Sequence, residues 1–127
     1  MSFRLSQKSL DRLSGVHPDL VAVVKRALEI SEVDFAVFEG VRSKTRQAQL
    51  FKEKATKTMN SRHITGHAVD LWAWVDGEVR WDWPLYHQIA KAMKAAATEL
   101  NIPIEWGGDW RTFKDGPHFQ LPRKEYP

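Results

Sequence analysis

The spacing of apolar residues along the chain predicts three helices. Apolar positions recur at helical spacing across residues 18–30, where Pro18 suits the first turn of a helix. A longer stretch, residues 84–100, repeats the pattern with its apolar side chains on one face. The third predicted helix spans residues 43–54, with Ser43 as its N-cap and Lys54 near its end.

Short apolar runs and turn residues predict strands between and after these helices. The predicted strands are 35–38, 68–75, a run through Val79 and Trp81, 104–106 and 118–121. Asp76-Gly77 is a strong signal for a tight hairpin after residues 68–75. Helices and hairpin strands in this mixed order indicate the α+β class, with a small antiparallel sheet flanked by helices.

The composition narrows the chemistry that the chain can carry. The 127 residues contain no cysteine, which excludes disulfides, a thiolate metal cluster and a cysteine nucleophile, so any metal ligands must be His, Asp or Glu. A net charge of +3 without a basic run is compatible with many anionic partners and selects none. The first residues lack the apolar segment of a secretory signal, and no stretch approaches the length needed to span a bilayer.

The strand at residues 68–75 carries the first candidate for chemistry. Because side chains alternate along a strand, Val69 and Leu71 belong to a core face, whereas Asp70 shares the opposite face with Trp72 and Trp74. A carboxylate between two indoles is costly to desolvate unless a cation or hydrogen-bond donors satisfy it. Taken alone, this residue is better explained as a surface aspartate.

His63 strengthens the metal interpretation. It lies in a turn-forming segment just before the strand, so its imidazole can fold back over Asp70 and offer zinc a second ligand. A competing arrangement pairs His63 with His67 at helical spacing, but Thr65 and Gly66 are poor helix formers and no Glu follows His63. We therefore expect His67 to be a neighbour rather than a ligand.

The third ligand must come from elsewhere, and His118 is the best candidate. Asp115, three residues earlier, is well placed to act as a general base, although an Asp before Gly116 is more often a solvated turn residue. The two remaining histidines, His17 and His87, are expected to have capping or surface roles.

Two motifs in this arrangement resemble the VanY/VanX-like zinc peptidases. The motifs are Ser61-x-His63-x-x-Gly66-x-Ala68-x-Asp70 and Asp115-x-x-His118. Three further segments resemble the L-alanyl-D-glutamate endopeptidase branch, which includes phage endolysins: residues 40–43, 106–110 and 117–121. The similarity runs from about residue 34 to residue 121.

The resemblance implies the Hedgehog/DD-peptidase fold and one Zn²⁺ ion. It assigns this ion three ligands, His63, Asp70 and His118. It also implies that Asp115 is the catalytic carboxylate and that Arg42 and Ser61 bind the substrate. Gln120 departs from the family, because many relatives have Glu at that position, and this leaves the surroundings of His118 open.

The resemblance further implies a biological role. We expect a single catalytic domain over residues 1–127, with no separate wall-binding domain, that hydrolyses the L-Ala–D-Glu bond of bacterial peptidoglycan and lyses the host. Without a signal peptide, such a protein is expected in the host cytoplasm, reaching the wall after holin-type release. We expect a monomer that neither binds nucleic acid nor inserts into the membrane.

Three alternatives remain at this point. A D-Ala–D-Ala carboxypeptidase would use the same zinc chemistry on a different bond. A non-catalytic wall-binding domain could keep zinc as a structural ion, but it would have no need of a base at Asp115. A nucleic-acid-binding module is disfavoured, because the basic residues do not interleave with the six tryptophans.

Overall fold

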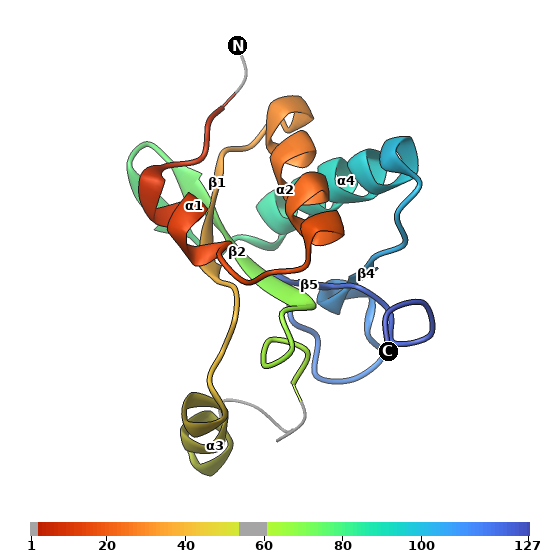
Figure 1. Ribbon diagram of the computed structural model, residues 1–127. Helices are drawn as coiled ribbons and strands as arrows, with labels where there is room; N and C mark the ends of the chain where they lie inside the picture. The colour runs from red at the N-terminus through yellow and green to blue at the C-terminus, as the bar shows by residue number, and fades with distance from the viewer. Residues whose placement is uncertain (1–2, 54–60) are drawn as a thin grey trace.

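The computed structural model describes residues 3–53 and 61–127 (Figure 1). The described elements are α1 (Gln7–Arg12), α2 (Pro18–Ile30), β1 (Phe35–Glu39), α3 (Lys44–Lys52), β2 (Ala68–Val75), β3 (Glu78–Arg80), α4 (Trp83–Leu100), β4 (Glu105–Trp106), the short 3-10 helix η1 (Gly107–Asp109) and β5 (His118–Gln120). The predicted α+β class, with a small antiparallel sheet and flanking helices, is confirmed.

The strand β2 lies at the centre of the sheet. The strand order is β1-β2-β5-β4, all antiparallel, and β3 pairs with the last residues of β2. The register pairs Asp70 of β2 with His118 of β5 on one side and with Glu39 of β1 on the other. Residues paired in this way project from the same face of a sheet, so three ionisable side chains are brought side by side.

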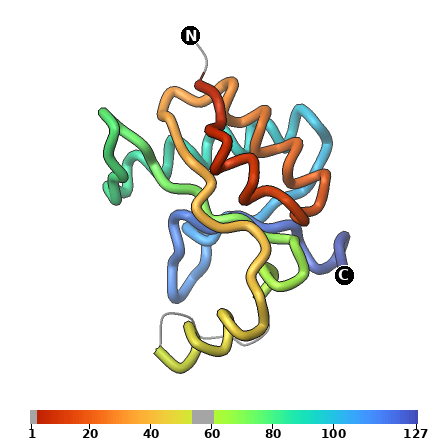
Figure 2. The backbone as a smooth tube through the Cα atoms, turned by 60° about the vertical axis from the view of Figure 1, so that its left-hand side comes forward, coloured from red at the N-terminus to blue at the C-terminus, as the bar shows by residue number. Residues whose placement is uncertain are grey.

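One face of β2 forms the core, as the alternation predicts. Val69, Leu71 and Ala73 are fully buried, whereas Trp74, on the opposite face, is 41% exposed. The helices α2 and α4 lie side by side over the core face (Figures 1 and 2). Removal of this apolar surface from water is the main force that holds the helical layer to the sheet.

The helix α1, which the sequence pattern did not reveal, covers the outer edge of β1. The backbone N–H of Val37 donates to Ser9 Oγ at 3.0 Å, and the carbonyl of Val37 accepts from Arg12 Nη1 at 3.1 Å. An uncovered edge strand would expose these backbone groups to pairing with another chain. A helix of six residues has too few apolar positions to give a periodic signal, and α1 works mainly through polar side chains.

The segment boundaries follow local chemistry closely. The hairpin turn has positive φ at both Asp76 (52°) and Gly77 (78°), as a type I′ turn requires.

The helix α3 begins after Ser43, whose side chain accepts from the N–H of Arg46. The predicted last residue of this helix, Lys54, lies outside the described residues. In both views α3 lies apart from the other helices, and its buried side chain, Gln47, is polar (Figure 2).

Candidate metal centre

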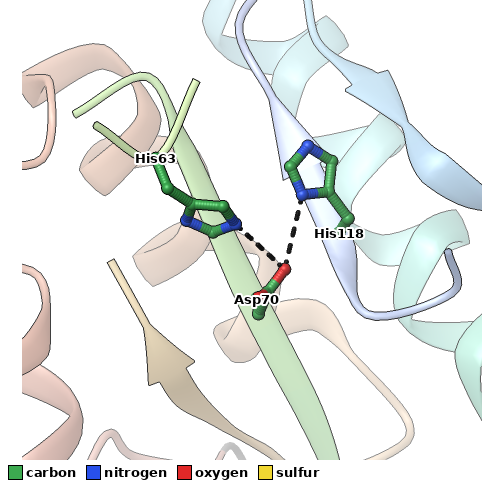
Figure 3. A group of neighbouring side chains, drawn as sticks. All are labelled: His63, Asp70 and His118. Atoms are coloured by element: carbon green, nitrogen blue, oxygen red, sulfur yellow. Dashed lines mark ion pairs between the residues drawn. The ribbon is translucent and has the colours of Figure 1, made fainter. Parts of the chain in front are cut away.

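Three side chains converge on the face of the sheet opposite the helical layer (Figure 3). Asp70 Oδ1 lies 3.3 Å from His63 Nε2 and 3.4 Å from His118 Nδ1. Within the described part of the chain, these residues form the one group of at least three His, Asp or Glu side chains that could hold a metal ion. The structure thus brings together the three residues predicted as ligands.

A tight turn and the sheet register position these ligands. The N–H of His63 donates to Ser61 Oγ at 3.1 Å, and the N–H of Gly66 donates to the carbonyl of His63 at 3.3 Å. Gly66 has a φ of 79°, a conformation that a glycine adopts without strain. The turn folds the imidazole of His63 over Asp70, and the antiparallel register places His118 directly opposite Asp70.

Hydrogen bonds on the far side of each imidazole select the nitrogen that faces Asp70. His63 Nδ1 lies 2.9 Å from the carbonyl oxygen of Gly40, which can only accept, so Nδ1 carries the proton of the neutral ring. His118 Nε2 lies 2.7 Å from Gln120 Oε1, which likewise accepts. The neutral forms therefore present lone pairs on His63 Nε2 and His118 Nδ1, as metal ligation requires.

The site is buried, and polar atoms within it lack partners. Among the described residues, His63 Nε2 and Asp70 Oδ1 are buried side-chain atoms without a hydrogen-bond partner. Burial alone would raise the pKa of Asp70, but the side chains of His118 and His63, when the nitrogens that face it carry a proton, outweigh burial and hold this pKa far below its usual range. A buried carboxylate oxygen and an imidazole nitrogen without partners, with the second imidazole beside them, are surroundings that a divalent cation completes.

Arg42 holds the second oxygen of Asp70. Its Nε and Nη2 bind the two oxygens of Glu39 at 2.7 and 2.9 Å, its Nη1 donates to Gln47 Oε1 at 2.7 Å, and its Nη2 reaches Asp70 Oδ2 at 3.5 Å. This network keeps Oδ1 directed at the two imidazoles.

A role for Glu39 was not predicted from the sequence. The only signal for this residue in the sequence is its position at the end of an apolar run, shortly before Arg42. The predicted contacts of Arg42 and Ser61 with a substrate stay predictions.

Asp115 lies beside the three ligands on the loop before β5. Its N–H donates to the carbonyl of Gly107 at 3.0 Å, and its carbonyl accepts from the N–H of His118 at 3.3 Å. A Cβ atom at Gly107 would lie 2.4 Å from the carbonyl oxygen of Asp115, so only a glycine permits this close approach. Burial, followed by the negative charge of Asp70, raises the pKa of the Asp115 carboxyl.

The other histidines lie outside this centre. His67 Nδ1 is 2.7 Å from Thr65 Oγ1, and its ring lies near those of His17 and Tyr126. His17 caps α2 by accepting from the N–H of Asp19 at 3.1 Å. His87 is exposed on α4. These positions agree with the expectation that none of the three is a ligand.

Gln120 and Glu105 form a relay that orients His118. Gln120 Nε2 donates to Glu105 Oε1 at 3.1 Å, which fixes the amide so that its oxygen faces the imidazole.

We expect Gln120→Leu to lower metal affinity by about 10–100-fold, because His118 would lose the group that selects its tautomer. Competition with a chromophoric chelator measures this affinity. Gln88→Leu, on the exposed surface of α4, is the control, and equal affinities in the two variants would contradict the relay.

The antiparallel sheet thus carries a His/Asp/His centre that could hold a metal ion, with the carboxylate-bearing Asp115 beside it. Residues 1–121 match the sequence profile of a family described as phage L-alanyl-D-glutamate peptidase. The chain belongs to this family.

Individual relatives agree with this assignment. The chain is 33% identical to the L-alanyl-D-glutamate peptidase of Escherichia phage T5, over 99% of this chain and 94% of that protein. It is 32% identical to the peptidoglycan L-alanyl-D-glutamate endopeptidase CwlK of Bacillus subtilis (strain 168), over 85% and 74%. It is also 32% identical to the L-alanyl-D-glutamate peptidase of Listeria phage A118, but it spans only 42% of that protein.

A solved structure has the same fold. The crystal structure of the Serratia marcescens L-Ala D-Glu endopeptidase ChiX aligns with a TM-score of 0.94 at 50% identity, over 99% of this chain and 95% of that one. In the described ranges of this chain, none of the helices is both long enough and apolar enough to cross a membrane.

Proposed function

We propose that this chain is a zinc peptidase that hydrolyses the L-Ala–D-Glu bond in the stem peptide of bacterial peptidoglycan. The observation that carries the proposal is the convergence of His63, Asp70 and His118 on one buried point that lacks hydrogen-bond partners. The names of the relatives from phages T5 and A118 and of CwlK supply the bond.

The residues of the centre fit a catalytic zinc ion. Two imidazoles and one carboxylate would hold the ion and leave a coordination position open, which distinguishes catalytic from structural zinc sites. A bound zinc ion supplies a Lewis acid for the scissile carbonyl and lowers the pKa of water at that position. Because the chain has no cysteine, the ligands are nitrogen and oxygen donors, a set that catalytic zinc sites use.

Asp115 supplies the proton transfer in this proposal. Its carboxylate takes a proton from the attacking water and then delivers that proton to the departing nitrogen of D-Glu. Because burial and the charge of Asp70 raise its pKa, the Asp115 carboxylate binds a proton more strongly than an ordinary aspartate. The turn through Gly107 keeps the Asp115 backbone hydrogen-bonded to that of His118.

Contacts of Arg42 and Ser61 with the substrate belong to the same proposal. Each residue is next to a ligand: Arg42 lies 3.5 Å from Asp70 Oδ2, and Ser61 Oγ accepts from the N–H of His63 at 3.1 Å. We also propose a role in host lysis after holin-type release from the cytoplasm, with which the phage origin of two relatives is compatible.

The scissile bond can be tested with purified peptidoglycan. We expect the zinc-loaded protein to release stem peptides that begin with D-Glu and to leave L-Ala on the glycan strands. Mass spectrometry of the soluble fragments, with chelator-treated protein as the control, identifies the new ends. Release of free D-Ala without peptides that begin with D-Glu would contradict the proposal and favour a carboxypeptidase.

A further inference from the structure

The sheet face that carries Asp70 continues into a pocket that the proposed chemistry does not use. Asp70, Trp72 and Trp74 follow one another on this face of β2. The two tryptophans line a pocket of about 350 Å³ together with Phe38 of β1 and Val79 of β3. We call this cavity the aromatic pocket. Its volume lies at the small end of the range for ligand sites, which is about 300–1,000 Å³.

Ring contacts give the aromatic pocket a firm floor. Phe38 and Trp72 are stacked, with their ring centroids 3.7 Å apart and their planes 10° apart. Trp81 packs edge-on against Trp72 at 5.2 Å. Trp74 and Trp81 nevertheless remain 41% and 59% exposed. Large indole surfaces left open to solvent beside a packed aromatic floor are typical of binding sites.

The charged groups around the pocket are mostly basic. Arg4, Lys8 and Arg12 line it, with Asp34 as the acidic residue among its lining. The guanidinium of Arg12 lies 5.9 Å from the centre of the Phe38 ring. These cations are hydrogen-bond donors beside an apolar floor, a combination that suits a ligand with a flat C–H face and many oxygen acceptors.

We propose that the aromatic pocket binds the N-acetylmuramic acid sugar that bears the stem peptide. This inference rests on the proposed function, because in peptidoglycan the L-Ala at the scissile bond is joined to that sugar through a lactyl group. The sugar ring can stack on the indoles, while its acetamido and hydroxyl oxygens accept from the basic residues.

The distances along β2 match the connection in the substrate. A strand advances about 3.3 Å per residue, so Trp72 and Trp74 lie about 7 and 13 Å beyond Asp70. L-Ala and the lactyl group together are about as long as two extended residues, or about 7 Å. A substrate whose scissile bond lies at the metal centre therefore brings its sugar to Trp72 and Trp74 when the peptide runs along this strand.

Two matched substrates test the inference. One is N-acetylmuramoyl-L-Ala-D-Glu-diaminopimelate, and the other is the same tripeptide with an acetyl group in place of the N-acetylmuramoyl group. We expect the protein to prefer the muramoyl substrate in kcat/KM, and Trp74→Ala to reduce this preference by about 10-fold. Trp81→Ala, at a more exposed position, provides a second variant. Leu100→Ala, 39% exposed at the far end of α4, is the control and should keep the preference.

The outcomes separate this inference from the proposed function. Equal kcat/KM for the two substrates, or a preference that neither tryptophan variant changes, would overturn the sugar site while leaving the peptidase proposal intact. An equal loss on both substrates would show that the pocket binds peptide, and would also overturn it. If neither substrate were cut at L-Ala–D-Glu, the proposed function itself would fail.

Discussion

Replacement of Asp70 by alanine is expected to abolish both metal binding and peptidase activity. Asp70 Oδ1 lies within 3.4 Å of both imidazoles and provides the only negative charge among the three ligands. Without it, two neutral imidazoles hold zinc weakly, and we expect kcat/KM to fall by at least about 1,000-fold. Metal content by elemental analysis and hydrolysis of purified peptidoglycan measure the two losses.

The matched control for this substitution is Asp11→Ala, an exposed aspartate on α1 whose side chain pairs with Gln7. It should retain one metal ion and full activity. Circular dichroism and thermal unfolding in the presence of chelator show whether Asp70→Ala folds like the metal-free wild type. A folded Asp70→Ala protein that bound one equivalent of zinc and remained active would contradict the assignment of Asp70.

Replacement of Asp115 by asparagine should separate metal binding from proton transfer. Asparagine has nearly the same shape but cannot take a proton from water, so we expect kcat to fall by about 100–10,000-fold. Because Asp115 is not a ligand in this account, the variant should bind zinc with nearly wild-type affinity. Zinc titration and the rate of peptidoglycan hydrolysis are measured on the same preparation.

Asp109→Asn is the control for this second substitution. Asp109 belongs to η1 on the same loop, and its carboxylate pairs with Lys94 at 2.7 Å on the surface. It should lower activity little. An Asp115→Asn protein with full activity would remove Asp115 from the mechanism.

Much of the centre could be predicted because its signals are local. The alternation along residues 68–75 already separates Asp70 from the core-facing Val69 and Leu71, and the structure confirms both faces. The turn residues before this strand indicate how His63 folds back over it. The pairing of Asp70 with His118 could not be derived in this way, because it depends on the register between β2 and β5. There the residues alone made His118 the best candidate, and the family resemblance assigned it as a ligand.

The supporting contacts were missed because they join residues that are distant in sequence or weak in pattern. Glu39 ends an apolar run and Gln47 lies within a predicted helix, and only the fold brings them to Arg42 beside Asp70. Glu105 likewise reaches the centre only through the pairing of β4 with β5, which places it opposite Gln120. Contacts of this kind, which support the ligands from behind, are fixed by tertiary packing. The periodicity of the sequence carries no information about that packing.

Crystals of the protein grown with zinc test the central claim most directly, by anomalous scattering at the zinc absorption edge. We expect one strong peak about 2.0–2.2 Å from His63 Nε2, Asp70 Oδ1 and His118 Nδ1. A peak at another group, such as the neighbouring His17 and His67, with none between these three atoms would contradict the account.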